Sequence, residues 1–300
     1  MRGQADTMDS SEMPHSMREE ELPIPTVTPE YPDRRRLRNL VRILLGTAFL
    51  LILVRVFILE PYGIPTGSMR PTILEGDVLL VNKLPYTIRS LRTIPFTRIP
   101  IPYLELPGFG ILQRGDVVVF DYPVLSDLRP DEGSQYVKRC VAIMGDTVQL
   151  VEGRIQVNGV EVPPRWGIEE DGSTRRIPIG RERAVSLLRD GYPVVVPSKG
   201  YEIELDSMTA ERWRRVIEGE GMSVEYRNRI VFIGGLPATR YTFQRNYFFA
   251  LGDNSAISKD SRYFGFIPYD NLIGRPWLIY WSRNPDTWQI RLERLGTVIK

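Results

Sequence analysis

Histidine and cysteine are almost absent from this chain. His15 and Cys140 are the only residues of their types among 300. A single cysteine can form no internal disulfide, and it cannot supply the several thiolates of a cysteine-based metal site. A zinc site would need mostly carboxylate ligands, which is rare in proteins. We therefore expect no metal and no other cofactor, and a reactive serine would need a base other than imidazole.

A strong excess of either charge is also missing. The formal net charge is +2, and 25% of the residues are charged, which is ordinary for a folded protein. This balance gives no reason to expect a nucleic-acid partner. A scatter of arginines over 165–215 is mixed with acids and indicates a solvated surface. A tighter cluster precedes the longest apolar run and consists of Arg34, Arg35, Arg36, Arg38 and Arg42.

That apolar run is long enough to cross a bilayer. Residues 43–59 read ILLGTAFLLILVRVFIL, at the short end of the ~17–25 residues that a spanning helix needs. Arg55 interrupts the run, but an arginine near a helix end can extend its charge to the interface. A buried core helix or a cleaved signal peptide would also explain the run. The long polar segment before it, and the lack of a small-residue cleavage site after it, argue against a signal peptide.

We accordingly predict one transmembrane helix over 40–59, preceded by a disordered basic tail over 1–39. Basic residues beside a membrane span favour the cytoplasmic side. The tail is therefore expected in the cytoplasm, and everything after Glu60 is expected outside it. The lipid bilayer becomes an expected partner of the chain.

The rest of the chain has the pattern of a mainly β fold. Short runs rich in β-branched and aromatic residues alternate with turn signals. The runs lie at 77–81, 116–120, 136–141, 147–151, 229–233, 247–251 and 272–281. Helical patterns occur around 181–189 and 209–218. We assign 60–159 and 245–300 to one β-rich domain and 160–244 to an inserted α+β subdomain. The proline-rich stretch 84–112 is either an irregular loop or a loop that lies on the membrane surface.

One serine stands close behind the apolar run, in the segment Ile64-Pro65-Thr66-Gly67-Ser68-Met69-Arg70-Pro71-Thr72. A serine hydroxyl is a poor nucleophile and needs a nearby base. Without histidine, a lysine, a carboxylate or an N-terminal amine remains. Lys138 lies in an apolar strand pattern, where burial would hold its amine neutral near working pH. A lysine in a strand more often points to solvent, so this pattern alone leaves both interpretations open.

Four short segments occur in a fixed order behind the apolar run. They are residues 64–72, Arg114-Gly115-Asp116-Val117-Val118-Val119-Phe120, Lys138-Arg139, and the stretch from Gly252 to Gly265. In this order the chain resembles bacterial type I signal peptidases, the membrane-anchored Ser/Lys proteases that release exported proteins. The resemblance covers the apolar run and most of 60–160 and 245–283, and it is loose over 160–240. It implies a signal-peptidase-like β-rich catalytic domain.

The resemblance implies a role for each matching residue. Ser68 matches the nucleophile of the family, and Lys138 matches its general base. Thr66 matches a hydroxyl that stabilises the oxyanion together with the backbone N–H of Ser68. The peptide substrate is expected to bind in an extended form, by strand addition, along the segments that flank the nucleophile and the base. The expected substrate-binding residues are Ile64, Pro65, Gln135, Tyr136 and Val137.

Supporting residues follow in the last segment. Ser258 matches the serine that orients the lysine, and Asp260 and Arg262 match a pair that supports the site electrostatically. The chain departs from the family just before them, where the family often has Arg, Asp and Asn. The residues at those three positions here are Ser255, Ala256 and Ile257.

Together these features predict a membrane-bound endopeptidase that removes N-terminal signal peptides from exported precursor proteins. The expected location is the bacterial cytoplasmic membrane, with a single span and an extracytoplasmic catalytic domain. A self-cleaving Ser/Lys repressor would share the chemistry, but the apolar run and the absence of a helix-turn-helix pattern argue against it. A catalytically inert, membrane-tethered β domain that binds peptides remains the alternative from another class.

Overall fold

The computed structural model describes most of the chain beyond residue 33. The described residues are 34–89, 105–122, 135–151, 154–162, 186–189, 191–254 and 256–300. The chain divides into two compact units, Met1–Ala48 and Phe49–Lys300. The predicted disordered tail up to residue 33 lies outside the described residues, as does most of the proline-rich stretch 84–112.

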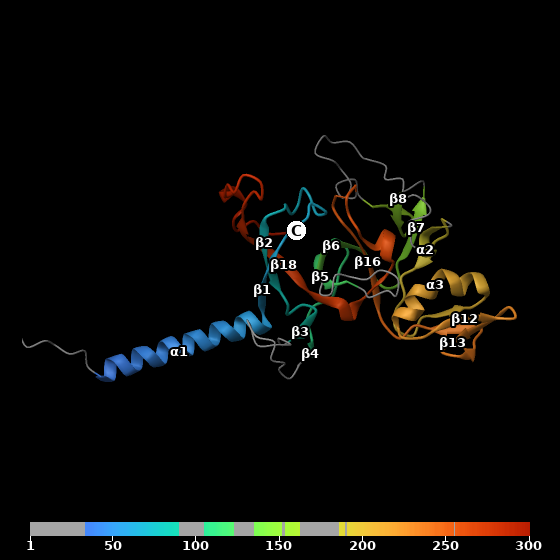
Figure 1. Ribbon diagram of the computed structural model, residues 1–300, viewed down its shortest axis with the longest axis horizontal. Coiled ribbons are helices and arrows are strands. Elements are labelled where there is room, and N and C mark those ends of the chain that lie inside the picture. The colour runs from blue at the N-terminus through green and yellow to red at the C-terminus, as the bar shows by residue number, and fades with distance from the viewer. Residues whose placement is uncertain are drawn as a thin grey trace, which may run out of the picture. The chain divides into compact units, whose positions relative to one another are not determined.

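Helix α1 spans Arg34–Phe57 (Figure 1). The part from Arg34 to Arg55 has a mean hydropathy of 1.9 and is long and apolar enough to cross a membrane. None of this part is buried, which argues against the core-helix alternative. The helix begins at Arg34 and not at residue 40, so the predicted tail is wrong for residues 34–39. Arginine is a good helix former, and no proline or glycine interrupts the basic cluster.

A seven-stranded antiparallel sheet forms the centre of the second unit, in the order β1-β2-β18-β5-β6-β16-β17. Its strands are β1 Leu59–Gly63, β2 Asp77–Asn82, β5 Val117–Asp121, β6 Gln135–Ala142, β16 Tyr247–Leu251, β17 Ile267–Pro268 and β18 Leu272–Ser282. The strands come from both parts of the chain that flank the segment 160–244. The predicted mainly β fold is therefore confirmed.

The alternation of buried and less buried side chains along the strands explains why the sheet forms. In β2 every second side chain is buried, as expected for a strand with one face in the core. Leu79 and Val81 of β2 pack with Val119 of β5 and Ile279 of β18 in one hydrophobic cluster. A second cluster contains Phe120, Phe248 and other residues of the neighbouring strands.

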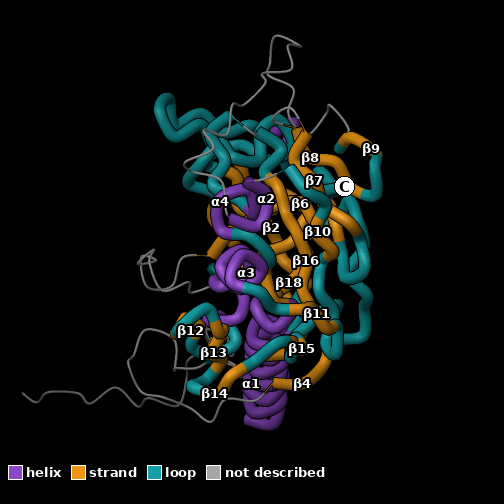
Figure 2. The backbone as a smooth tube through the Cα atoms, turned by 90° about the vertical axis from the view of Figure 1, so that its right-hand side faces the viewer, coloured by secondary structure: helices purple, strands orange, loops and turns teal. Residues whose placement is uncertain are grey.

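The segment after β6 builds smaller sheets and short helices. Its elements are β7 Thr147–Val151, β8 Arg154–Val157, β9 Val160–Glu161, α2 Ser186–Arg189, β10 Val194–Val195, β11 Glu202–Glu204, α3 Ser207–Gly219, β12 Val224–Arg227, β13 Ile230–Ile233, β14 Leu236–Pro237 and β15 Arg240–Thr242. The remaining elements are β3 Thr87–Arg89, β4 Glu105–Pro107, α4 Ser261–Phe264 and the 3₁₀ turns Tyr269–Asn271 and Leu292–Arg294. Helix α3 lies beside β12 and β13 (Figure 2).

The α+β composition predicted for 160–244 is present, but its core is continuous with that of the sheet. Trp213 and Ile217 of α3 belong to the same hydrophobic cluster as Val141 of β6 and Phe249 of β16. Helix α3 is amphipathic, and its apolar side chains at helical spacing face this cluster. The inserted segment therefore shares a hydrophobic core with β6, the strand that carries Lys138.

Asp77 ties three distant segments together. Its buried carboxylate accepts hydrogen bonds from the Leu74 backbone (2.8 Å), the Ser282 hydroxyl (2.6 Å) and the Arg294 guanidinium (2.6 Å). Leu74 ends the loop between β1 and β2, and Arg294 lies near the C-terminal end of the chain. A buried charge is tolerated only when it is paired in this way.

We predict that Asp77→Asn lowers the free energy of unfolding of the detergent-solubilised chain by at least about 2 kcal/mol, because two charge-assisted bonds are lost in a buried place. Denaturant unfolding followed by tryptophan fluorescence measures this change. Asp286→Asn, at an exposed position, is the control and is expected to unfold at the wild-type denaturant concentration. Equal stability of the two variants would contradict this role of Asp77.

Candidate active site

Ser68 lies in the loop that joins β1 to β2. Backbone hydrogen bonds between residues 64 and 76–77 close the base of this loop, with the Ile64 N–H donating to the Asp77 carbonyl over 2.9 Å. Met69 and Ile73 are buried and belong to the same hydrophobic cluster as the strands beneath. The loop is thus anchored on the sheet immediately after Ser68, and the serine itself is only 8% exposed.

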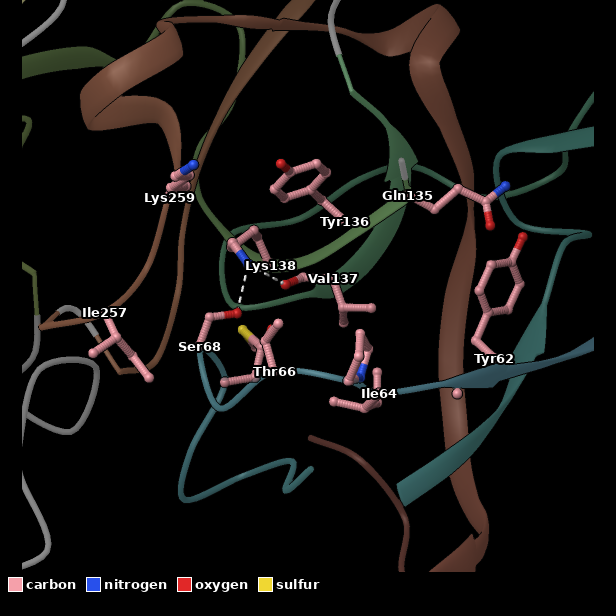
Figure 3. A pocket seen from close by; sticks show the side chains of 13 residues that line it. Tyr62, Ile64, Thr66, Ser68, Gln135, Tyr136, Val137, Lys138, Ile257 and Lys259 are labelled. Atoms are coloured by element: carbon pink, nitrogen blue, oxygen red, sulfur yellow. Dashed lines mark hydrogen bonds between the residues drawn. The ribbon is translucent and has the colours of Figure 1, made fainter. Parts of the chain in front are cut away.

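Lys138 reaches this serine from the middle of β6. Its backbone pairs with Val118 of β5, and its side chain is 3% exposed. The Lys138 Nζ atom lies 2.7 Å from Ser68 Oγ and 3.0 Å from the Val137 carbonyl oxygen (Figure 3). The ring of Tyr136 lies 5.4 Å from the same nitrogen. The lysine thus points inward and contacts the serine, although 70 residues separate the two in sequence.

Burial changes the acidity of this lysine. Removing the ammonium group from water lowers the pKa of Lys138 from 10.5 to about 8. The carboxylates of Asp260 and Asp253 act in the opposite direction and raise the pKa, while the Arg262 guanidinium lowers it. Burial is the largest of these effects. A useful fraction of Lys138 is therefore neutral at physiological pH and has a free lone pair beside the Ser68 hydroxyl.

Asp260 and Arg262 form a buried ion pair below this site. Arg262 Nε donates to Asp260 Oδ1 over 2.8 Å, and Arg262 Nη2 donates to Oδ2 over 2.9 Å. The Asp260 side chain also caps the N-terminus of α4 and accepts from the Gly252 backbone over 3.1 Å. The pair therefore holds the end of β16 in place next to the serine loop.

Ser258 is buried beside the same loop, but it does not contact the lysine through a hydrogen bond. Within the described part of the chain, its hydroxyl has no hydrogen-bond partner. A side chain added at Gly252 would collide with the Ser258 hydroxyl and with the Ser68 carbonyl oxygen, which shows how closely these segments approach. The predicted role of Ser258 in orienting Lys138 stays a prediction.

A second buried ion pair was missed by the sequence analysis. Arg139, which follows the lysine on β6, donates to the Asp253 carboxylate over 2.8 and 2.6 Å. The Thr72 hydroxyl donates to the same carboxylate over 2.5 Å. Because neighbouring strand residues point to opposite faces, Arg139 clamps the serine loop from the side that Lys138 does not occupy. An arginine directly after the lysine, in an apolar strand, was the available signal.

A cavity of about 660 Å³ opens beside Ser68 and Lys138. All five predicted substrate-binding residues line it, together with Thr66. Ser258, Asp260 and Arg262 are buried and are not among the lining residues. The other lining residues are Tyr62 and Gly63, which lie in the flanking segment expected to bind the peptide, and Met69, Ile257 and Lys259, which the sequence analysis did not predict.

Two hydrogen-bond donors at the cavity have no protein acceptor. Among the described residues, neither the backbone N–H of Ser68 nor the hydroxyl of Thr66 makes a hydrogen bond. Both residues line the cavity. Both donors are therefore available to a ligand in the cavity. In the same described residues, no group of three or more His, Cys, Asp or Glu side chains could hold a metal ion.

Comparison with known proteins agrees with this geometry. The family model described as signal peptidase, peptidase S26, matches residues 37–281. Signal peptidase I of Pseudomonas aeruginosa is 30% identical over 261 residues, which cover 83% of this chain and 74% of the relative. Signal peptidase I of Buchnera aphidicola is 28% identical over 268 residues, which cover 85% of this chain and 80% of the relative.

Among solved structures, a signal peptidase I from Enterococcus faecalis is 23% identical and covers 56% of this chain and 98% of that chain, with a TM-score of 0.25. The family model extends from helix α1 to the end of β18 and includes both Ser68 and Lys138. By this match, the chain belongs to the signal peptidase family, peptidase S26.

Proposed function

We propose that this protein is a signal peptidase in which Ser68 is the nucleophile and Lys138 the general base. Its substrates are exported precursor proteins, from which it removes N-terminal signal peptides. One observation carries the assignment of the two residues. Ser68 Oγ lies 2.7 Å from the amine of a buried lysine whose pKa is lowered to about 8. A base of this kind replaces the imidazole that the chain lacks.

The chemistry proceeds in two balanced steps. Neutral Lys138 takes the Ser68 proton while Ser68 Oγ attacks the carbonyl carbon of the scissile bond. The resulting Lys138 ammonium gives this proton to the departing amine, and an ester between Ser68 and the signal peptide remains. Lys138 is then neutral again and takes a proton from water, whose oxygen attacks the ester carbon. The bond from this carbon to Ser68 Oγ breaks, the Lys138 ammonium returns the proton to Ser68 Oγ, and the signal peptide leaves with a free carboxylate.

The oxyanion that forms in each step is stabilised by hydrogen-bond donors that are in place before the reaction begins. The free Ser68 N–H and the Thr66 hydroxyl serve this purpose, since both border the cavity beside Ser68 Oγ. Donors of this kind act on charge that develops only in the transition state, and removing one costs about 10²–10³-fold in rate.

The two extended segments that lead to Ser68 and Lys138 bind the signal peptide. Gly63–Pro65 and Gln135–Val137 both line the cavity, and an extended peptide between them can form backbone hydrogen bonds. The side chains of Ile64 and Val137 pack in the same hydrophobic cluster, and we expect only shallow apolar depressions beside them. Such depressions suit small side chains before the cleaved bond.

Helix α1 anchors the enzyme in the bacterial cytoplasmic membrane as a single span. The arginine cluster at its N-terminal end favours the cytoplasmic side, which leaves the catalytic domain outside. Ser68 comes eleven residues after Phe57, the last residue of this helix, and the cleavage sites of exported precursors emerge at the same membrane surface. A catalytically inert domain that only binds peptides would not need a buried lysine beside a serine.

We predict that Ser68→Ala and Lys138→Met each lower the cleavage of a precursor peptide by at least about 10³-fold, because either change removes the nucleophile or its base. The assay uses the full chain in detergent, and the cut site is mapped by mass spectrometry. Ser223→Ala and Lys199→Met are matched controls at exposed positions outside the cavity. Full activity of Lys138→Met would refute the mechanism.

The rate should depend on the protonation of Lys138. Since only the neutral amine accepts a proton, kcat/KM should rise about tenfold per pH unit below the pKa and level off above pH 8. A pH–rate profile of the wild-type enzyme on a peptide without titratable groups measures this. A midpoint near 10.5, the ordinary value for lysine, would show that burial does not control the base.

The hydroxyl of Thr66 can be tested separately. Thr66→Val keeps the size of the side chain but removes the donor, and should lower kcat about 10²-fold with a smaller change in KM. Thr66→Ser retains the donor and should keep most of the activity. If both variants lose the same activity, the shape of Thr66 and not its hydroxyl is what matters.

A further inference from the structure

One side of the cavity remains without a role in the proposed mechanism. In Figure 3, Tyr62 and Gln135 lie on one side of Ser68 and Lys138, while Ile257 and Lys259 lie on the opposite side. Tyr62 and Gln135 both line the cavity at the end where the two extended segments begin. The signal peptide is assigned to that end, so the peptide beyond the cleaved bond extends toward Ile257 and Lys259.

The position of Lys259 is fixed by its neighbours. Ser258 and Asp260, on either side of it, are 3% and 0% exposed. Asp260 is held by Arg262 and by the Gly252 backbone. Lys259 itself is exposed and lines the cavity. Its backbone is therefore anchored on both sides, while its ammonium group stands at the mouth of the site.

The charges around the cavity favour an acidic ligand at this mouth. Of the thirteen lining residues, Lys138 and Lys259 are the charged ones, and no carboxylate lines the cavity. Lys138 is buried and serves Ser68. Across the described residues, Lys259 forms no ion pair. Ile257, which is 62% exposed beside it, adds an apolar surface for the stem of a bound side chain.

We propose that Lys259 binds the side chain of the first residue after the cleaved bond and favours precursors in which this residue is Asp or Glu. The proposal rests on the assigned function, because it uses the direction of the peptide across Ser68. It concerns the mature part of the substrate, whereas the extended segments at Ile64 and Val137 bind the signal peptide.

Three precursor peptides that differ only at the first residue after the cut, Glu, Gln or Lys, test this proposal with the full chain in detergent. For the wild type we expect kcat/KM to be about two- to fivefold higher for the Glu peptide than for the Lys peptide, as for an exposed ion pair. Lys259→Gln should bring this ratio close to one, and Lys259→Glu should invert it. Salt at about 1 M, where the Debye length is about 3 Å, should also reduce the wild-type ratio.

Lys199→Gln is the matched control, because Lys199 is an exposed lysine outside the cavity and its loss should leave the ratio unchanged. Equal kcat/KM for the Glu and Lys peptides in both the wild type and Lys259→Gln would overturn the proposal, while cleavage of all three peptides would leave the peptidase function intact. If the wild type cleaves none of them, including the neutral Gln peptide, the assigned function fails and the proposal fails with it.

Discussion

A lysine amine kept dry beside a serine hydroxyl is the arrangement on which the rest of this site depends. An ammonium group in water keeps its proton at neutral pH, so it cannot accept one from Ser68. Burial in the sheet reverses this preference by making the charged form unfavourable, and the pKa of Lys138 falls from 10.5 to about 8. The strand that holds Lys138 must therefore be covered by apolar side chains, and the serine loop must lie tightly over the amine.

The two buried ion pairs help to keep the pKa of Lys138 low. Asp253 and Asp260 lie near Lys138, and each would favour the charged amine if it stood alone. Arg139 and Arg262 neutralise them through two hydrogen bonds each. The carboxylates can therefore hold the loop and the end of β16 in place with less effect on the neutral form of the Lys138 amine. Removing one partner of such a pair would leave an uncompensated charge close to the amine.

Much of the site could be predicted from the sequence, for identifiable reasons. The scarcity of histidine, together with the apolar neighbours of Lys138, predicted a lysine base. The turn signals predicted where the strands begin and end. The contacts of Arg139 with Asp253 and Thr72 could not be predicted, because periodicity indicates which face a side chain occupies but not which carboxylate 114 residues away will meet it. The same limit applies to Lys259, whose place at the cavity depends on how the loop before α4 folds over β6. Helix α1 begins earlier than predicted because the prediction counted only apolar residues. The arginines before the apolar run are good helix formers and extend the helix toward the N-terminus.

The most direct test of the account is the pKa of Lys138 itself. The chain has five lysines, so the lysine side chains can be labelled with ¹³C at Cε and followed by NMR during a pH titration of the full chain in detergent. The signal that is absent from Lys138→Met belongs to this residue. The account predicts that this signal titrates with a midpoint near 8, whereas a midpoint near 10.5 would show that the amine beside Ser68 is charged at neutral pH and would contradict the assignment of Lys138 as the base.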